Sequence, residues 1–334
     1  MNNDLKAKAN STWLKILNIQ GITAVVPLVV LVVVASILNP VFLKPTNLAT
    51  LGGAIIGIWG LFAIGQAYII IAGEIDLSMG GLLAFAAVFF SYMLLNGMPI
   101  WLAIIITFAI TIAVELINAF VVLKLNVPVF IATLGMQYIC KGLAKVVNYG
   151  AAVTIYSSTN PAVKQFCDAL SVKPLGLSLS FWCFIILMIA AHLLLKKTRF
   201  GRQVYAVGDN KNVAKMAGIN VAKVKVLCYL MIGVLVGLSS VLWVGISAGS
   251  AVTHGVGWEF IAISACAMGG VSLVGGRGSM IGVLLGVITM GVIYNVISLL
   301  GINVNYQNIF VGLFLAFAVI FDVIRREKTL GKNI

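Results

Sequence analysis

Four acidic side chains lie within or beside long apolar stretches of the sequence, where carboxylates are rare. Glu74 and Asp76 share one short polar segment, and Glu259 follows a glycine-rich run. Glu115 lies in the middle of an apolar stretch, three residues before Asn118. A carboxylate at the bilayer centre costs roughly 2.5–3.5 kcal/mol on insertion scales, so it usually faces the interior of a helical bundle. No set of nucleophile, base and acid accompanies these residues, which indicates a polar path or structural hydrogen bonds rather than covalent catalysis.

Two glycine-rich segments interrupt the apolar pattern, GEIDLSMGG at 73–81 and GGVSLVGGRGS at 269–279. Non-helical backbone at membrane depth is tolerated only where protein or a water-filled cavity covers it. Broken helices turn their ends toward a transport path. The alternative is two tight cytoplasmic turns, the first with Asp76 and Ser78 capping the next helix, and the sequence leaves both interpretations open. The residues expected along a path are Gly73, Glu74, Asp76, Ser78, Glu115, Asn118, Glu259 and Ser272. Among them, Glu115 is either a structural group or a path residue, and Glu259 is expected at the membrane interface rather than buried.

The elements that position these residues are apolar helices. The 334 residues are 61% hydrophobic and only 9% charged, against about 25% charged in soluble domains. Apolar runs long enough to span a bilayer recur along the chain. We therefore predict an all-α, polytopic membrane protein with glycine-rich broken-helix segments, forming a single transmembrane domain over residues 1–334. About ten spans are expected, at 22–38, 48–72, 79–95, 100–123, 127–147, 177–195, 226–249, 258–274, 280–299 and 305–324.

The distribution of basic residues predicts how the chain crosses the membrane. The stretch 196–225 holds eight of the 22 Lys and Arg residues, and basic loops lie on the cytoplasmic side. With both termini inside, seventeen basic residues fall on the cytoplasmic side and five on the other. This predicts cytoplasmic tails at 1–20 and 325–334 and an external loop at 148–176, with a short helix near 161–170. The net charge of +13 thus reflects topology and is no argument for binding nucleic acid.

A short helix is expected inside the basic stretch, over 209–218. Asp209 or Asn210 can cap its start, and Gly218 can end it in a left-handed turn. About two helical turns are not stable alone in water. The segment is therefore either a solvated surface helix or an element that docks on a partner. Its apolar face, with i, i+3, i+4 spacing, consists of Val213, Met216 and Ala217.

Nothing in the sequence indicates a cofactor bound to this chain. The five cysteines show no CxxC or metal-ligand spacing, and the two histidines are isolated. No Walker A pattern occurs, so the chain has no evident means of hydrolysing ATP.

Several motifs occur in order along nearly the whole chain: GEIDLSMG at 73–80, TRFGRQVYAVGDNKNVAKMAGINV at 198–221, GVGWEFIAIS and GGVSLVGGRG within 255–278, and NVISLLGINVNYQ at 295–307. They resemble the permease subunits of bacterial ABC importers for monosaccharides, of the ribose, xylose, galactose and autoinducer-2 type, within the branched-chain amino acid permease superfamily. Some positions depart from that pattern. Glu74 stands where Gly is usual, Ile261 where Asp is common and Lys215 where a second Ala is usual, while Trp258 replaces Tyr and Phe260 replaces Leu. The departures at 74 and 261 bear on the substrate, because a sugar needs hydrogen-bonding groups.

The resemblance implies a channel formed by two permeases, a second copy or a sister chain, in the lipid of the bacterial inner membrane. It implies a cytoplasmic ATPase subunit that holds ATP and Mg²⁺, and an extracytoplasmic sugar-binding protein. This chain would be a multi-pass transport subunit with both termini cytoplasmic, no cofactor and no enzymatic activity of its own. The resemblance assigns ATPase coupling to the loop 196–225, at Gly208, Asp209, Asn210, Val213, Ala214, Met216, Ala217 and Gly218.

Two other functions fit the residues. The first is a permease of the same superfamily that carries a branched-chain amino acid or a nucleoside. The second is an ion-coupled secondary transporter in which Glu74, Asp76 and Glu115 hold the coupling ion.

Overall fold

The computed structural model describes residues 22–303 except 157 and 159, together with positions 306, 309, 312, 313, 316 and 320. The tails expected at 1–20 and 325–334 lie outside the described residues, as does the span expected at 305–324 apart from those isolated positions.

The described part of the chain is helical apart from one very short ladder. Strands β1 (Val153–Thr154) and β2 (Gly249–Ser250) pair antiparallel, with Val153 opposite Ser250. The 3-10 helices are η1 (Pro40–Leu43) and η2 (Pro174–Gly176). The α-helices are α2 (Ile22–Leu38), α3 (Pro45–Leu51), α4 (Ala54–Ile71), α5 (Met79–Leu95), α6 (Ile100–Leu123), α7 (Val129–Val147), α8 (Pro161–Ser171), α9 (Leu179–Lys197), α10 (Arg199–Asp209), α11 (Lys211–Met216), α12 (Val221–Ser247), α13 (Trp258–Met268) and α14 (Met280–Leu299).

The prediction of an all-α polytopic membrane protein is confirmed. Among the described residues, six helical stretches are long and apolar enough to cross a membrane, and α5 and α13 are shorter apolar helices. The span predicted at 258–274 is wrong in length. Its helix α13 has 11 residues and is about 16 Å long at 1.5 Å per residue, roughly half of a bilayer's hydrocarbon core.

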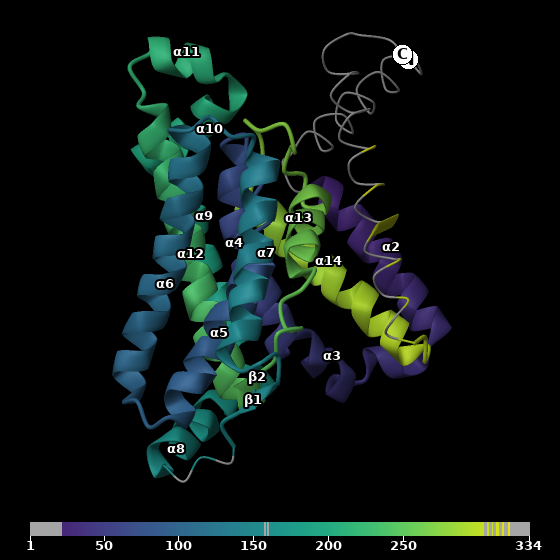
Figure 1. Ribbon diagram of the computed structural model, residues 1–334. Coiled ribbons are helices and arrows are strands. Elements are labelled where there is room, and N and C mark those ends of the chain that lie inside the picture. The colour runs from purple at the N-terminus through teal and green to yellow at the C-terminus, as the bar shows by residue number, and fades with distance from the viewer. Residues whose placement is uncertain are drawn as a thin grey trace, which may run out of the picture.

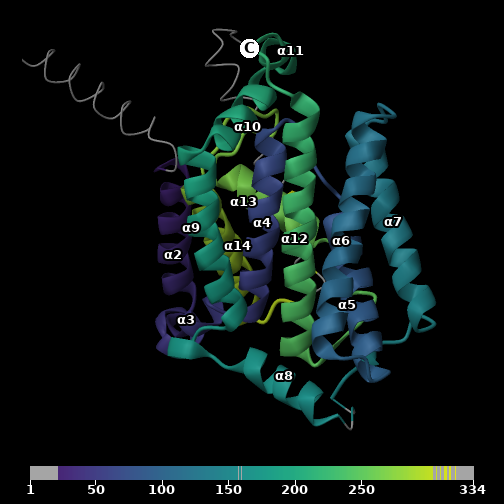
Figure 2. The ribbon, with the colours of Figure 1, turned by 90° about the vertical axis from the view of Figure 1, so that its left-hand side faces the viewer.

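Helix α4 lies at the centre of the bundle. Every residue from Ile56 to Ile71 is buried, and α9, α12, α13 and α14 pack around it. Figure 2 shows α4 between α9 and α12, with α6 and α7 beyond α12. Because all sides of α4 contact protein, it needs no polar face and reads as a uniformly apolar run.

The two ends of the molecule carry different elements. Helices α10 and α11 lie at one end, which we call the α11 end, and α8 with the β1–β2 ladder lies at the other, the α8 end (Figures 1 and 2). The helix predicted near 161–170 is confirmed as α8. It packs on the last turns of α12, where Leu170 lies against Gly245.

The charge split predicts that the α11 end is cytoplasmic. We expect a single cysteine at position 212, in a background without the five native cysteines, to resist an impermeant thiol reagent in intact cells. We expect one at position 158 to react. Because the membrane alone protects position 212, permeabilised cells should label both. Labelling of position 212 from outside intact cells would contradict the orientation.

Candidate functional site

Two of the shorter apolar helices, α5 and α13, begin next to each other inside the bundle. Gly80, in the first turn of α5, packs against the carbonyl of Gly255 and the carboxylate of Glu259 so closely that a Cβ would collide with both. The chain reaches α13 from β2 through a non-helical segment, visible in Figure 1. Gly255 and Gly257 have positive φ values of 81° and 84° there, which glycine adopts at little cost. The sequence therefore breaks two helices at the same place.

Glu259 lies in the first turn of α13 and is 1% exposed. The expectation that it is interfacial is therefore wrong. The unpaired N–H groups at a helix start favour negative charge, and Glu259 lies at the starts of both α13 and α5. Gln137 on α7 donates a hydrogen bond from Nε2 to Glu259 Oε1. Glu259 is buried because α13 is short and begins inside the bundle. Hydropathy did not reveal this length.

A second group of polar residues joins the break before α5 to helix α6. The Ser78 hydroxyl lies 2.7 Å from Asp76 Oδ1 and 3.1 Å from Glu115 Oε1, and its single proton can be donated to only one of them at a time. Asn118 Nδ2 donates to Ser78 Oγ at 2.9 Å and to Glu115 Oε2 at 3.2 Å. The backbone N–H of Ser78 also donates to Asp76 Oδ1 at 2.7 Å. Asp76 thus orders the start of α5, as the capping alternative expects, but it is also part of a buried network.

Several oxygens of these two groups have no partner within the described part of the chain. They are Asp76 Oδ2, Asn118 Oδ1 and Glu259 Oε2, each on a residue that is at most 1% exposed. A buried acceptor without a partner is unfavourable by about 1–3 kcal/mol. The arrangement can therefore accept hydrogen bonds from a solute that carries several donors.

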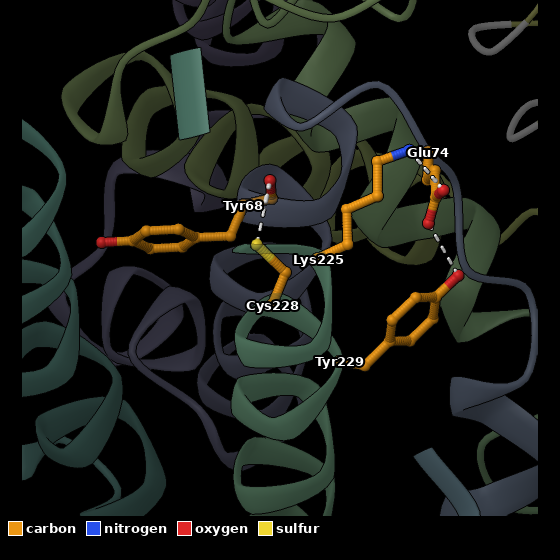
Figure 3. Close-up of polar contacts among 5 residues, drawn as sticks. All are labelled: Tyr68, Glu74, Lys225, Cys228 and Tyr229. Carbon is orange, nitrogen blue, oxygen red and sulfur yellow. Dashed lines mark hydrogen bonds and ion pairs between the residues drawn. The ribbon is translucent and has the colours of Figure 1, made fainter. Parts of the chain in front are cut away.

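Glu74 does not join this network, although it is only two residues from Asp76. Its Oε1 lies 2.6 Å from Lys225 Nζ, and its Oε2 accepts from the Tyr229 hydroxyl at 3.0 Å. Both partners are on α12 and approach Glu74 from the same side (Figure 3). Sequence reasoning missed these partners because they lie 151 and 155 positions away. Lys225 ends the stretch assigned to a basic loop, and Tyr229 belongs to the span predicted at 226–249.

The two glycine-rich segments meet each other and α10 at the α11 end. The Gly276 N–H donates to Ile71 O at 2.9 Å. A Cβ on Gly208, the second-last residue of α10, would collide with Ile71 O and with the backbone of Gly276. Gly73 lies against Gly208 in the same contact. We call this backbone contact of residues 71–73, 208–209 and 274–276 the glycine junction.

Ser272 lies beside the glycine junction rather than with Asp76. It belongs to a tight turn in which its N–H donates to Arg277 O and its carbonyl accepts from the Gly275 N–H. The Tyr205 hydroxyl of α10 donates to Gly278 O at 2.7 Å. Burial raises the pKa of Tyr205, which keeps the hydroxyl protonated and able to donate. The second glycine-rich segment is therefore a turn held against α10.

The expected short helix in the basic stretch is confirmed as α11. Asn210, not Asp209, caps it by accepting from the N–H groups of Asn212 and Val213 at 3.0 and 3.1 Å. Gly218 ends it with φ of 79°, and the Ile219 N–H closes the turn onto Ala214 O. Asp209 is the last residue of α10.

The α11 face that the sequence predicts to be apolar is exposed in the described part of the chain. Val213 is 54% exposed, Met216 is 81% exposed, and Ala217 is also exposed. Ala214 points the other way and is buried, and Gly208 belongs to the glycine junction. Ala214 and Gly208 were both expected to contact the ATPase, but in the structure they pack against this chain itself.

Helix α10 was not predicted as a separate element. Thr198 caps it through a 3.2 Å hydrogen bond from the Gly201 N–H, and its buried residues are Gly201, Val204 and Val207. That spacing of i, i+3, i+6 is a helical pattern in the sequence. The four basic residues around its start made the segment look like a polar loop; they are Lys196, Lys197, Arg199 and Arg202.

Comparison with known proteins identifies relatives along most of the chain. The family described as "Branched-chain amino acid transport system / permease component" matches residues 49–319. The ribose import permease protein RbsC of Bacillus subtilis is 34% identical over 295 residues, covering 88% of this chain and 90% of that protein.

Two further relatives cover as much or more of the chain. RbsC of Escherichia coli K12 is 31% identical, covering 90% of this chain and 92% of its own length. The L-arabinose ABC transporter permease protein AraH of Azospirillum brasilense is 33% identical, covering 98% of this chain and 94% of its own. No solved structure matches the chain. The chain belongs to the branched-chain amino acid transport system permease family and is a membrane permease of the ABC importer type, not an enzyme.

Proposed function

We propose that this permease carries a pentose-like monosaccharide across the bacterial inner membrane. The observation that carries this proposal is the buried meeting point of α5 and α13, where carboxylate and amide oxygens without partners lie at two helix starts. Sugars present several hydroxyl donors, which match such acceptors. The similarity to ribose and arabinose permeases supports the same substrate class.

The path that we propose runs along the α5–α13 meeting point. Its polar residues are Asp76, Ser78, Glu115, Asn118 and Glu259. Gly73, Glu74 and Ser272 lie at the α11 end of the same break or at the glycine junction, so they border the path rather than contact the solute at its centre. The broken helices place helix ends and uncompensated acceptors inside the bundle, as transport sites commonly do.

Helix α11 is proposed as the contact with a cytoplasmic ATPase subunit, which holds ATP and Mg²⁺. A capped helix of this length needs a partner to cover its apolar face, and Val213, Met216 and Ala217 provide that face. Asn210 and Gly218 fix its two ends, with Asp209 just before it. Gly208 and Ala214 connect it to the membrane part. Rigid-body motion of α11 would then reach the breaks directly.

The remaining partners follow from the type of importer. An extracytoplasmic sugar-binding protein would meet the α8 end, and a second copy of the chain or a sister permease would complete the channel. We propose that both termini lie on the cytoplasmic side, which is supported by the excess of seventeen basic residues on that side over five on the other.

Two alternatives remain distinguishable by experiment. A branched-chain amino acid is the substrate named by the family description, but it carries a cationic amino group, and the Asp76–Glu115 network would then pair with that group. An ion-coupled secondary transporter is disfavoured by the match to ABC permeases.

Uptake measurements should separate the substrate classes. We expect cells that express the whole importer to accumulate labelled ribose or arabinose, and cells that lack only this chain to lose that uptake. Unlabelled pentoses should compete, and leucine should not, because leucine has an aliphatic side chain in place of the hydroxyl donors that match the acceptors of the site. Competition by leucine and none by pentoses would overturn the sugar assignment.

Replacing Asp76 tests the path. We expect Asp76→Ala to assemble but to reduce uptake by about tenfold or more, since hydrogen bonds to charged groups contribute about 1.5–3 kcal/mol and 1.4 kcal/mol corresponds to tenfold. Normal uptake by Asp76→Ala would leave the residue with only its capping role.

Two substitutions test the docking helix. Ala217→Arg adds bulk and charge to the exposed face of α11, and we expect it to lose most co-purifying ATPase. A Cβ at Gly218 meets no other atom within 4 Å, so Gly218→Val acts through its positive φ, which is unfavourable by about 1–2 kcal/mol, and should weaken coupled transport.

The matched control is Ala162→Arg, the same change at an exposed position of α8. It should retain the ATPase because it lies at the other end of the molecule. Normal co-purification and coupled transport in Ala217→Arg would place the ATPase contact elsewhere at the α11 end.

A further inference from the structure

Glu74 and Lys225 of α12 form the one ion pair found among the described residues. Its two charged side chains are nearly buried, with 5% exposure for Glu74 and 11% for Lys225. The Tyr229 hydroxyl satisfies the second carboxylate oxygen, and Tyr229 itself is fully buried. Both oxygens of Glu74 are thus held, each by a different residue of α12 one turn apart.

Glu74, Lys225 and Tyr229 connect a non-helical segment to the start of a long helix. Glu74 lies in the non-helical segment between α4 and α5, where residues 74–78 have no helical hydrogen-bond ladder of their own. Lys225 and Tyr229 lie in the first two turns or so of α12. Helix α12 follows α11 after the short link 217–220, and Asn220 caps its start by accepting from the Lys223 N–H at 2.9 Å.

The ion pair is not needed to form the turn itself. Gly73 supplies the positive φ of 85° that the chain requires there. The motif that this segment resembles has glycine at position 74, where no side-chain contact could form. The carboxylate therefore adds a fixed attachment to a segment whose backbone can already turn.

That attachment lies two residues before Asp76 and four before Ser78. A non-helical segment takes its position from its side-chain contacts and from the elements at its two ends. One end of 74–78 is fixed by the glycine junction and the other by the Ser78 network. Glu74 is the point between them that is bound to α12.

We propose that Glu74, Lys225 and Tyr229 form a clamp that fixes the break before α5 to the α11 end of α12, so that movement of the docking helix repositions Asp76 and Ser78. This inference rests on the proposed function, because it assumes that α11 receives the motion of the ATPase. In this role the three are positioning residues, and none of them needs to touch the sugar.

The test separates positioning from the burial of a charge. Glu74→Gln or Lys225→Met alone leaves one charge buried without its partner, which destabilises proteins strongly. The double variant Glu74→Gln/Lys225→Met leaves no unpaired charge, so its assembly should recover. The measurement uses the complete importer in liposomes with its binding protein and sugar, and records both sugar uptake and ATP hydrolysis.

We expect the double variant to assemble like the wild type but to transport about tenfold fewer sugar molecules per ATP hydrolysed, within the range of 5- to 150-fold found for coupling between sites. Hydrolysis should become less dependent on the binding protein. The charge-exchanged variant Glu74→Lys/Lys225→Glu should recover part of the ratio. Lys223→Met removes an equal charge from the exposed side of the same helix end and should keep the wild-type ratio.

A double variant with the wild-type ratio would reduce the ion pair to a structural contact and overturn the proposal. Equal loss of the ratio in Lys223→Met would also overturn it, since the effect would then follow from charge alone. Failure of the proposed function looks different, because the wild-type importer itself would not transport a pentose. In that case the dependence of ATP hydrolysis on the clamp, compared between wild type and double variant in the assembled complex, still decides whether it links the docking helix to the break.

Discussion

The structure depends on one constraint, that polar backbone within an apolar bundle must be satisfied by protein. Each break in a helix exposes N–H or C=O groups that lipid cannot bind. In this chain the breaks are placed against one another. The Gly276 N–H meets Ile71 O, and the starts of α5 and α13 meet at Gly80 and Gly255. The missing side chains of glycine make these contacts possible, and the contacts in turn determine which polar residues come together.

Placing two helix starts together also explains how the buried acids Asp76, Glu115 and Glu259 are accommodated without a buried cation next to each of them. The positive ends of α5 and α13 favour the Glu259 carboxylate, and the Gln137 amide adds a donor. Neutral groups also serve the other two acids: the Ser78 hydroxyl lies within hydrogen-bond distance of both Asp76 and Glu115, and Asn118 donates to Ser78 and Glu115. Neutral donors and helix ends can release a solute without breaking an ion pair, and this property supports the path that we propose.

Much of this could be predicted from the sequence, and what could not has a physical reason. Apolar runs located the spans, Asn210 and Gly218 located α11, and charge predicted the orientation that labelling can test. Hydropathy did not show that α13 stops after 11 residues, because Val271, Leu273 and Val274 continue the apolar residues into the glycine-rich segment that follows it. It could not bring Glu74 to Lys225 either, since only the packing of α4 against α12 does that. The wrong expectation that Glu259 is interfacial followed from the first of these errors, the overestimated length of α13.

The glycine junction and the Glu74 clamp differ in what they can transmit. Backbone packed on backbone, as at Gly73 and Gly208, strongly resists being pushed together, and a single hydrogen bond such as that of Gly276 resists separation only weakly. An ion pair with a second hydrogen bond resists being pulled apart, more so where water is excluded. If α11 is the docking helix that we propose, and moves in both directions during a cycle, both kinds of contact are needed to carry α5 with it. The two contacts lie at adjacent residues, Gly73 and Glu74, so in the proposed coupling the break would follow α10 when compressed and α12 when pulled away.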